Sequence, residues 1–422
     1  MLIEFKVRNF RSFKDETTFS MVSESLKSEV GIFLTRSNMY LLPLAGIFGA
    51  NASGKSNLIK AIAFFQGSVT NPNSLNQPST IHPLLKPYLL DKKTFAEPSF
   101  FEIVLWDREE KKEYKYGFEI SSKRIESEWL EVTEKVNKKF VAKTIFYRNG
   151  NEFKIAPGHK KALGILTDKV LPTAPAVYVF AQFAHAQSVK LVNLVDQLVV
   201  IDGTRDVTVH SLQKLTEDPV LKDEVRDFLL GADISLKDFD ISKEEVPQNQ
   251  AQAMPIQLTS PDKNAKFNLV QFEVSTMHTR KDGVGVKFNL HDHESLGTQR
   301  LFGFAAFILQ VLKNGQTIFI DEFANSMHPF ISAALLKLFQ NVDTNPNGAQ
   351  LIFVTHDTYL LTDAVKLRRD QVWFAEKNKD EESKLIGLAE YRTRSDLNIE
   401  KNYLEGRFGG VPITTFRNNH GL

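Results

Sequence analysis

Hydrophobic and polar positions at the start of the chain predict two strands, a buried strand and a helix. Residues 2–7 alternate apolar and polar side chains, and residues 17–22 form a second segment of this kind. Residues 41–48 are apolar almost throughout, which is typical of a strand that is buried on both faces. Apolar positions at helical spacing then continue to about Gly67.

The next part of the chain reads as a loop followed by antiparallel strands. Residues 69–98 are rich in Asn, Pro and Ser, which favours a loop. Strands are predicted at residues 100–106, 113–120, 126–136 and 144–147. Since these strands follow one another closely, we expect an antiparallel β subdomain over residues 100–155, grafted onto the first lobe.

The middle of the chain changes to a helical pattern. Residues 158–231 are predicted to be mainly helical, with apolar residues at i, i+3 and i+4 spacing in 189–198 and 219–230. Residues 243–266 form a polar connector. Strands at 268–276 and 284–290 then flank Asp282-Gly283, a strong hairpin-turn signal.

A βαβ unit is predicted near the end of the chain. Residues 317–320 and 350–354 are short apolar strands, and residues 330–339 between them have a helical pattern. An apolar helix at 303–312 precedes this unit, and residues 372–422 alternate strand and loop signals. The sequence as a whole therefore indicates an α/β protein with a mixed β-sheet core.

Composition narrows the class of protein. With 422 residues the chain exceeds a typical single domain, and 24% charged with 42% hydrophobic residues indicates a soluble globular protein. With a formal net charge of +1, the charge of the whole chain does not favour nucleic-acid binding, so a DNA site would have to be a local basic patch. The absence of cysteine excludes disulfides, zinc–thiolate sites and cysteine catalysis. Without a secretory signal or an apolar segment long enough to cross a bilayer, we expect a cytoplasmic protein that has no membrane partner.

The junction between the buried strand and the first helix carries the clearest chemical motif. Residues 49–56 read Gly-x-x-x-x-Gly-Lys-Ser, the P-loop pattern, in the required context of strand, loop and helix. The glycines let successive backbone N–H groups point into one concavity, and the helix start adds its positive dipole end. Lys55 is expected to reach the outer phosphates and Ser56 to ligate Mg²⁺. The predicted nucleotide-binding residues here are Asn51, Ala52, Ser53, Gly54, Lys55, Ser56 and Asn57.

Two later strand ends add acidic and imidazole side chains. Asp321 and Glu322 end the strand at 317–320, where Asp321 is expected to hold Mg²⁺ and Glu322 to polarise the attacking water. His356 follows the next strand and is expected to contact the γ-phosphate. Because ligands bind at strand ends in such sheets, these residues are predicted to meet the P-loop.

A fourth motif opens the predicted apolar helix. Ser295 is a good N-cap residue and Gly297 permits close backbone approach, within the run Glu294-Ser295-Leu296-Gly297-Thr298. Taken alone, this run predicts an ordinary capped helix. In chain order, however, it lies between the P-loop and the acidic strand end.

That order resembles the ABC-type ATPases, and within them the SMC/RecF-like group. The resemblance implies that Ser295-Leu296-Gly297-Thr298 is a divergent signature motif, that Asp321-Glu322 is the Walker B pair with the catalytic glutamate, and that His356 is the switch histidine. Catalysis is then expected to rest on Glu322, His356 and Lys55, with metal ligation by Ser56 and Asp321 and further nucleotide contacts from Ser295, Gly297 and Thr298. Gln182 is a candidate for the Q-loop glutamine. The cofactors implied are ATP and Mg²⁺.

The resemblance also implies a domain organisation. Residues 1–157 are expected to form the ATPase N-lobe with the P-loop and the antiparallel β subdomain, and residues 158–267 a helical insertion with the polar connector. Residues 268–371 would form the C-lobe and 372–422 a C-terminal extension. The predicted fold class is thus an α/β P-loop NTPase of the ABC-ATPase type.

More narrowly, three segments resemble ATPases of bacterial anti-phage defence operons, the RloA, abortive-infection and PARIS-like proteins. These segments are residues 294–298, Asp321-Glu322 with His328-Pro329, and residues 403–412. The resemblance implies an ATP-sandwiched homodimer or higher oligomer that acts as a sensor or scaffold and controls a separate effector protein. A phage-derived trigger or nucleic acid is a further partner that it implies.

Two other functions stay open at this point. A DNA-repair or recombination ATPase of RecF/SMC type would bind DNA directly, and short basic runs exist at residues 159–161 and at Lys366 with Arg368-Arg369. The second open function is a nucleotide-gated binding module with negligible turnover. The signature motif reads Ser-Leu-Gly-Thr instead of Ser-Gly-Gly-Gln, and this difference affects the residues that would contact the γ-phosphate.

Overall fold

The structure of the protein is a computed structural model. It describes residues 1–24, 33–34, 39–71, 85–137, 139–201, 209–232, 236–246, 269–392 and 398–411. The chain divides into two compact units. The first comprises Met1–Gly203, Val311–Asn325 and Ser332–Leu422, and the second comprises Thr204–Gln310 and Ser326–Ile331. Within the described ranges, no helix is long and apolar enough to cross a membrane.

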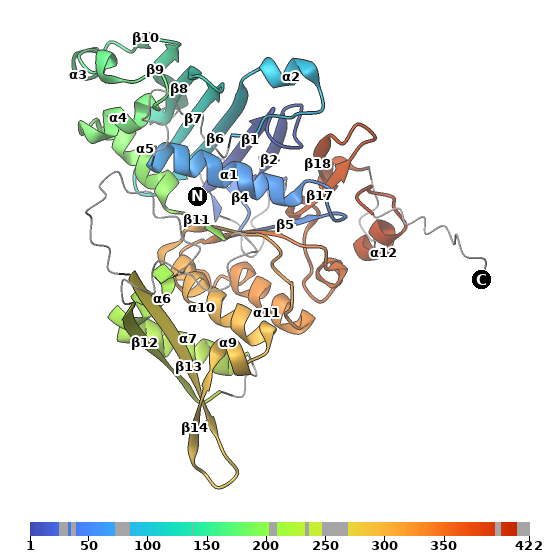
Figure 1. Cartoon of the computed structure of the whole chain (residues 1–422). Helices are drawn as coiled ribbons and strands as arrows, with labels where there is room; N and C mark the ends of the chain where they lie inside the picture. The colour runs from blue at the N-terminus through green and yellow to red at the C-terminus, as the bar shows by residue number, and fades with distance from the viewer. Residues whose placement is uncertain are drawn as a thin grey trace. The chain divides into compact units, whose positions relative to one another are not determined.

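A seven-stranded antiparallel sheet forms one layer of the first unit (Figure 1). In spatial order its strands are β10 (Glu152–Ile155), β9 (Lys139–Asn149), β8 (Ile125–Val136), β7 (Lys112–Ile120), β6 (Ser99–Asp107), β1 (Leu2–Arg8) and β2 (Thr17–Ser20). The antiparallel strands predicted from the sequence are therefore confirmed, but they do not stand apart from the start of the chain. β6 pairs directly with β1, so the first strand of the chain belongs to the same sheet.

A six-stranded mixed sheet forms the second layer of this unit. Its strands in spatial order are β11 (Leu198–Ile201), β15 (Thr317–Ile320), β16 (Gln350–Val354), β5 (Leu44–Phe48), β17 (Val372–Lys377) and β18 (Ser383–Gly387). The first five run parallel to their neighbours and β18 is antiparallel to β17. β15, α11 (Pro329–Gln340) and β16 form the predicted βαβ unit.

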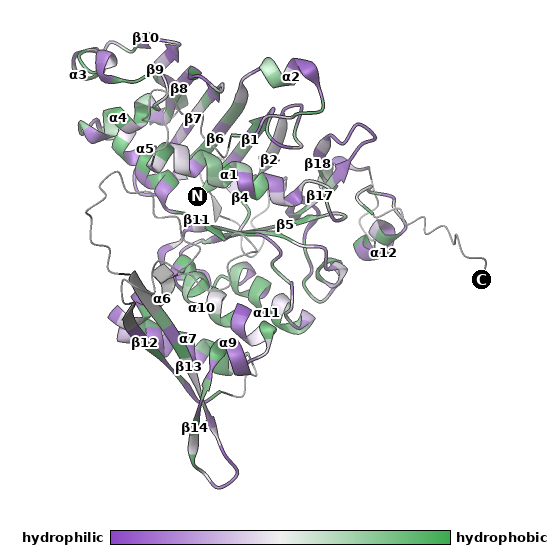
Figure 2. Cartoon of the chain, in the orientation of Figure 1, coloured by the Kyte–Doolittle hydropathy of each residue, from purple (hydrophilic) through white to green (hydrophobic). Residues whose placement is uncertain are grey.

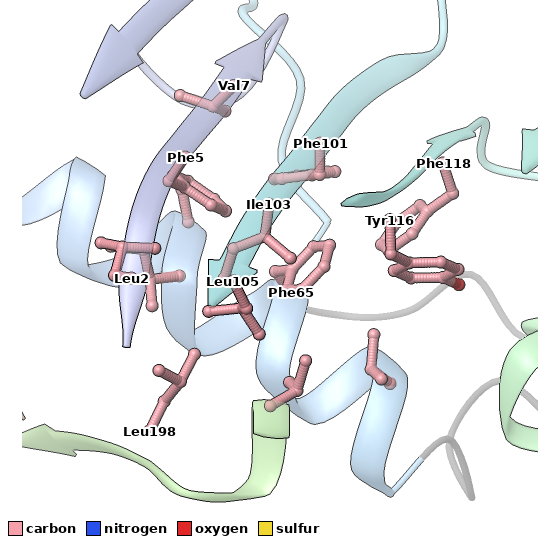
Figure 3. Close-up of a cluster of buried hydrophobic side chains, with 14 of the residues drawn as sticks. Leu2, Phe5, Val7, Phe65, Phe101, Ile103, Leu105, Tyr116, Phe118 and Leu198 are labelled. Atoms are coloured by element: carbon pink, nitrogen blue, oxygen red, sulfur yellow. The ribbon is translucent and has the colours of Figure 1, made fainter. Parts of the chain in front are cut away.

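Helix α1 (Lys55–Thr70) supplies side chains to the core that the two sheets share. The ring of Phe65 stacks on Phe118 of β7 at 5.5 Å and meets Phe5 of β1 edge-on at 5.9 Å. Figure 3 shows Phe65 among these residues of the antiparallel sheet. Ile47 of β5 and Val354 of β16 belong to the same buried cluster. The helix that follows the P-loop is therefore fixed by apolar packing along its length.

A buried amide joins the two sheets of the first unit. The Gln350 side-chain oxygen accepts hydrogen bonds from the Leu2 N–H at 2.6 Å and the Thr317 hydroxyl at 2.9 Å. Its side-chain nitrogen donates to the Leu2 carbonyl at 3.0 Å and the Leu42 carbonyl at 3.1 Å. This one side chain of β16 therefore satisfies backbone groups of β1 and of Leu42, just before β5, as buried polar groups require.

The remaining helices of the first unit are mostly short. They are α2 (Lys92–Ala96), α3 (Lys160–Leu163), α4 (Ala176–Gln182), α5 (Ala186–Asp196) and α12 (Ile399–Leu404). The small strands β3 (Phe33–Leu34) and β4 (Tyr40–Leu41) pair with each other.

The second unit contains a three-stranded antiparallel sheet and several helices. Its sheet is β12 (Asp238–Val246), β13 (Leu269–Thr279) and β14 (Gly285–Asn289). The helices are α6 (Val209–Glu217), α7 (Pro219–Gly231), α9 (Leu290–His293) and most of α10 (Leu296–Asn314). Hydrophobic residues dominate α10 and are coloured green in Figure 2. The predicted hairpin turn at Asp282-Gly283 joins β13 and β14 and is confirmed.

Several local predictions were wrong, each for a physical reason. The buried strand begins at Leu44 instead of residue 41, since Pro43 has no N–H to donate to a sheet. The helix predicted over 189–198 ends at Asp196, because Leu198–Ile201 forms the edge strand β11 beside β15. β12 occupies the start of the predicted polar connector, where its pairing with β13 outweighs local polarity.

The bounds of two helices also differ from the prediction. Helix α2 lies inside a predicted loop, and Asp91 caps it. Helix α10 begins at Leu296 instead of residue 303, because the Ser295 hydroxyl accepts the Thr298 N–H and so caps the helix one turn or more earlier. Residues 247–266 of the connector lie outside the described residues.

Candidate functional site

The carboxyl ends of the parallel strands bring the P-loop and the acidic strand end to one edge of the sheet. Ile320 of β15 is level with Phe353 of β16, and Val354 is level with Ile47 of β5. The residues that follow these strands, Gly49, Asp321 and Thr355, therefore lie at the same edge. This is the place where ligands bind in open parallel sheets.

The P-loop is held from outside by two serines that sequence reasoning missed. The Ser383 hydroxyl of β18 donates to the Ser53 carbonyl at 2.8 Å, and the Ser383 N–H donates to the Ser12 carbonyl at 2.8 Å. Asn57 of α1 in turn donates from its side chain to the Ser12 hydroxyl at 2.7 Å. Gly54 has a φ of 106°, and a side chain there would collide with Ser383. A glycine is therefore required at this point of the loop.

Lys55 lies folded back on its own loop. Its Nζ donates to the carbonyls of Gly49 and Ala50, each at 2.7 Å, and the side chain is only 9% exposed. Burial lowers the pKa of the Lys55 ammonium, and the nearby carboxylates of Asp321 and Glu322 oppose that shift. A buried cation of this kind favours an anionic ligand, which phosphate groups supply.

Ser56 and Asp321 form the oxygen pair that a hard cation would use. The Ser56 hydroxyl donates to Asp321 Oδ1 at 3.0 Å. Burial raises the pKa of the Asp321 carboxyl, and the charge of Glu322 raises it further, whereas the Ser56 hydrogen bond lowers it. Mg²⁺ prefers one or two carboxylate and hydroxyl oxygens together with phosphate oxygens and water. The donor set therefore fits Mg²⁺ bound together with a nucleotide.

Glu322 adopts a backbone conformation that is rare for its residue type. Its φ is 52°, and its side chain is exposed at the sheet edge. The Asn325 side-chain amide donates to Glu322 Oε2 at 3.1 Å, a contact that the sequence did not predict. The Glu322 N–H donates to Asp321 Oδ1 at 3.1 Å, which fixes the two acids relative to each other. Strained backbone of this kind concentrates at functional sites.

His356 lies two residues after β16, so it follows the strand beside the acidic end of β15. The neighbouring Thr355 hydroxyl accepts the Asp357 N–H at 3.0 Å, which orders the turn that presents the exposed His356 ring. The structure thus brings the P-loop, Asp321, Glu322 and His356 to one edge. Asn51 and Ala52 lie exposed on the P-loop, and Gln182 lies exposed at the end of α4.

The Ser-x-Gly-Thr motif lies in the second unit, at the start of α10. The Ser295 hydroxyl accepts the Thr298 N–H at 3.1 Å, so the predicted N-cap is confirmed. Glu294, just before it, accepts hydrogen bonds from the Thr276 hydroxyl and pairs with His278 Nε2 at 2.7 Å. Gly297 packs so closely that an added Cβ would lie 2.6 Å from the Ser326 carbonyl oxygen.

This fold and this edge of the sheet define a P-loop NTPase of the α/β class. Sequence comparison adds the family: residues 44–162 and 189–362, more than half of the chain, match the family described as "AAA domain, putative AbiEii toxin, Type IV TA system". The chain belongs to this family of AAA-type ATPase domains. No curated protein matches the sequence.

A likeness to a solved structure can be added. The SMC head domain from Thermotoga maritima is 15% identical in sequence, with a TM-score of 0.40, and the match covers 92% of this chain and 98% of that one.

Proposed function

We propose that the protein binds ATP with Mg²⁺ at the P-loop and hydrolyses it. The observation that carries this proposal is the 3.0 Å hydrogen bond between Ser56 and Asp321, with Glu322 as the next residue at the same strand end. Bound Mg²⁺ would neutralise charge on the phosphates. Ser56 and Asp321 would hold it, Lys55 would bind the outer phosphates, Glu322 would take a proton from the attacking water, and His356 would bind the γ-phosphate.

We further propose that a second copy of the chain completes the site. Ser295 is exposed, and Gly297 is half-buried at the start of α10. Their backbone N–H groups and the Ser295 and Thr298 hydroxyls suit a phosphate presented by another protomer. ATP would then join two protomers, and hydrolysis would release them.

The proposed biological role is that of a cytoplasmic ATPase subunit in anti-phage defence. The family description, which names a putative AbiEii toxin and a Type IV toxin–antitoxin system, supports this setting. The ATPase would sense a phage-derived trigger and control a separate effector protein through its nucleotide state.

One observation weighs against direct DNA binding by a basic run. Arg368 pairs with Asp370 at 2.7 Å, and Arg369 donates to the Tyr391 carbonyl at 2.6 Å. These guanidinium groups are engaged within the fold, whereas phosphate binding needs exposed cations.

Two experiments test the proposal at its two levels. Calorimetric titration with Mg²⁺-ATP and a phosphate-release assay test the site, and Glu322→Gln is expected to bind ATP with kcat lowered about 10²–10⁴-fold. Phage plating on cells that carry the gene with its genomic neighbours tests the role. Plating that is equal with and without the gene would contradict the defence role and leave the ATPase proposal standing.

A further inference from the structure

The residues that follow α12 lie beside the P-loop, and they have no role in the ATP binding and hydrolysis proposed above. We call residues 405–410 the C-terminal glycine turn. A cavity of about 840 Å³ is lined on one side by P-loop residues 50–53 and on another by this turn. Gly406, Gly409 and Gly410 have φ values of 76°, 68° and 68°, so the turn depends on left-handed backbone at three positions.

Aromatic stacking fixes this turn on β17. The rings of Tyr403 and Phe408 each stack on Phe374 with centroids 5.1 Å apart. The Tyr391 hydroxyl donates to the Phe408 carbonyl at 3.0 Å, and the Tyr403 hydroxyl donates to the Gly410 carbonyl at 3.1 Å. Buried aromatic contacts of this kind hold a segment in one position.

The anchored turn presses its last glycine against the first glycine of the P-loop. A Cβ on Gly410 would lie 3.0 Å from the Ala375 carbonyl oxygen and 3.4 Å from Gly49 Cα. A Cβ on Gly49 would collide with the same Ala375 oxygen. Three backbone segments therefore meet at a spacing that is too close for a side chain at Gly49 and tight for one at Gly410.

Gly49 also carries the carbonyl that holds Lys55. The Lys55 Nζ donates to that oxygen at 2.7 Å. A shift of the Ala375 carbonyl would therefore move Gly49. Because the Gly49 carbonyl holds Lys55, it would also move the lysine that is proposed to bind phosphate. The contact connects the C-terminal glycine turn to the phosphate-binding end of the site.

We propose that the C-terminal glycine turn is a positioning element of the nucleotide site, in which Gly410 sets the conformation of Gly49 and thereby the affinity of the P-loop for nucleotide phosphates. This inference rests on the proposed function, because it assumes that the P-loop binds a nucleotide. It gives the C-terminal glycine turn a physical role that does not depend on the effector.

The test compares Gly410→Ala with Gly406→Ala in the full chain. Both glycines have similar positive φ values, so both substitutions strain the backbone alike. No atom lies within 4 Å of a Cβ on Gly406, whereas the Cβ on residue 410 would press on Ala375. We expect Gly410→Ala to weaken Mg²⁺-ATP binding about fivefold or more relative to Gly406→Ala, since small-to-large changes displace packed backbone.

The readouts are calorimetric affinity, melting temperature and steady-state kinetics. The two variants are expected to melt alike, and KM for ATP is expected to rise by a larger factor than kcat falls in Gly410→Ala, because the loop is expected to hold the phosphates of bound ATP less tightly. Tyr403→Phe removes only the hydroxyl that holds Gly410, and it serves if Gly410→Ala does not fold. It should shift affinity in the same direction.

Equal ATP affinity of Gly410→Ala and Gly406→Ala, or of Tyr403→Phe and the parent if the alanine variant does not fold, would overturn the inference. A parent protein that binds no nucleotide would instead overturn the proposed function. The two failures are therefore distinguishable.

Discussion

The hydroxyl of Ser56 donates to the carboxylate of Asp321 at 3.0 Å, although 265 positions separate the two residues in the chain. Ser56 lies in the first turn of α1, and Asp321 follows the last residue of β15. The two residues meet because β5, β16 and β15 pair in parallel, and their register aligns the carboxyl ends of the strands. The proposed metal site is therefore a consequence of sheet topology.

Replacement of the proposed base should separate binding from hydrolysis. We expect Glu322→Gln to lower kcat by about 10²–10⁴-fold, the range for loss of a general base, with Mg²⁺-ATP affinity kept. Glu109→Gln, at a side chain that is 85% exposed, is the matched control. Phosphate release and calorimetric titration measure the two effects. Turnover equal to the parent would show that another group activates the water.

Removal of the Asp321 charge should weaken Mg²⁺ binding. In Asp321→Asn we expect the Mg²⁺ concentration needed for half-maximal nucleotide binding to rise at least about tenfold, as for loss of a metal-site partner. Titration of MgCl₂ at fixed ATP measures this. An unchanged Mg²⁺ dependence would place the metal elsewhere.

The same substitution should change the pH dependence of stability without nucleotide. Burial raises the pKa of Asp321 above its ordinary value of 3.8, so the folded state holds this proton more tightly than the unfolded state. The contribution of this group is fully present below 3.8 and is lost as pH rises through the raised pKa. Asp321→Asn should therefore gain stability over the parent as pH rises through that window. Urea unfolding of both proteins across acidic to neutral pH measures the difference, and a gap that does not grow would contradict the expectation.

The buried amide between the sheets makes a prediction about the fold alone. Gln350→Leu leaves the backbone groups of Leu2 and the Leu42 carbonyl without their partner, so we expect a loss of about 3 kcal/mol or more in unfolding free energy. Gln213→Leu, at an exposed position of α6, is the control. Equal losses in urea unfolding would contradict this account of how the two layers are joined.

Complementation tests whether the site is shared between protomers. Lys55→Ala removes the P-loop cation, and Ser295→Arg places bulk on the exposed start of α10. Each variant alone should be inactive. An equal mixture should recover about a quarter of parental ATPase activity, because half of randomly formed dimers carry one intact site of two. No recovery in mixtures that do form dimers would contradict a site made of the P-loop of one protomer and the Ser295 motif of the other.

Motifs with fixed local chemistry were predictable from the sequence, and so was the α/β class. The P-loop, the acidic end of β15 and the N-cap Ser295 are each short runs whose residue types determine their local structure. The contacts of Ser12, Ser383 and Asn325 were not predictable, because such residues are common in loops and only the folded chain brings them to the P-loop or to Glu322.

Strand assignments failed where pairing outweighs local pattern. Leu198–Ile201 has too few residues to show a period, and it becomes a strand because it pairs with β15. β12 is mostly polar and becomes a strand because β13 lies beside it. Pairing with a strand that is distant along the chain leaves no hydrophobic pattern within the short segment itself, so the segment's own residues do not predict it.

The most direct test of the central claim is the rate of ATP hydrolysis measured against protein concentration, for the parent and for Glu322→Gln. If ATP is hydrolysed at sites that two protomers share, the specific activity of the parent should rise with protein concentration, and Glu322→Gln should lower it about 10²–10⁴-fold. Turnover in Glu322→Gln equal to that of the parent, or a parent that hydrolyses no ATP at any concentration with Mg²⁺ present, would show that this site does not act as proposed.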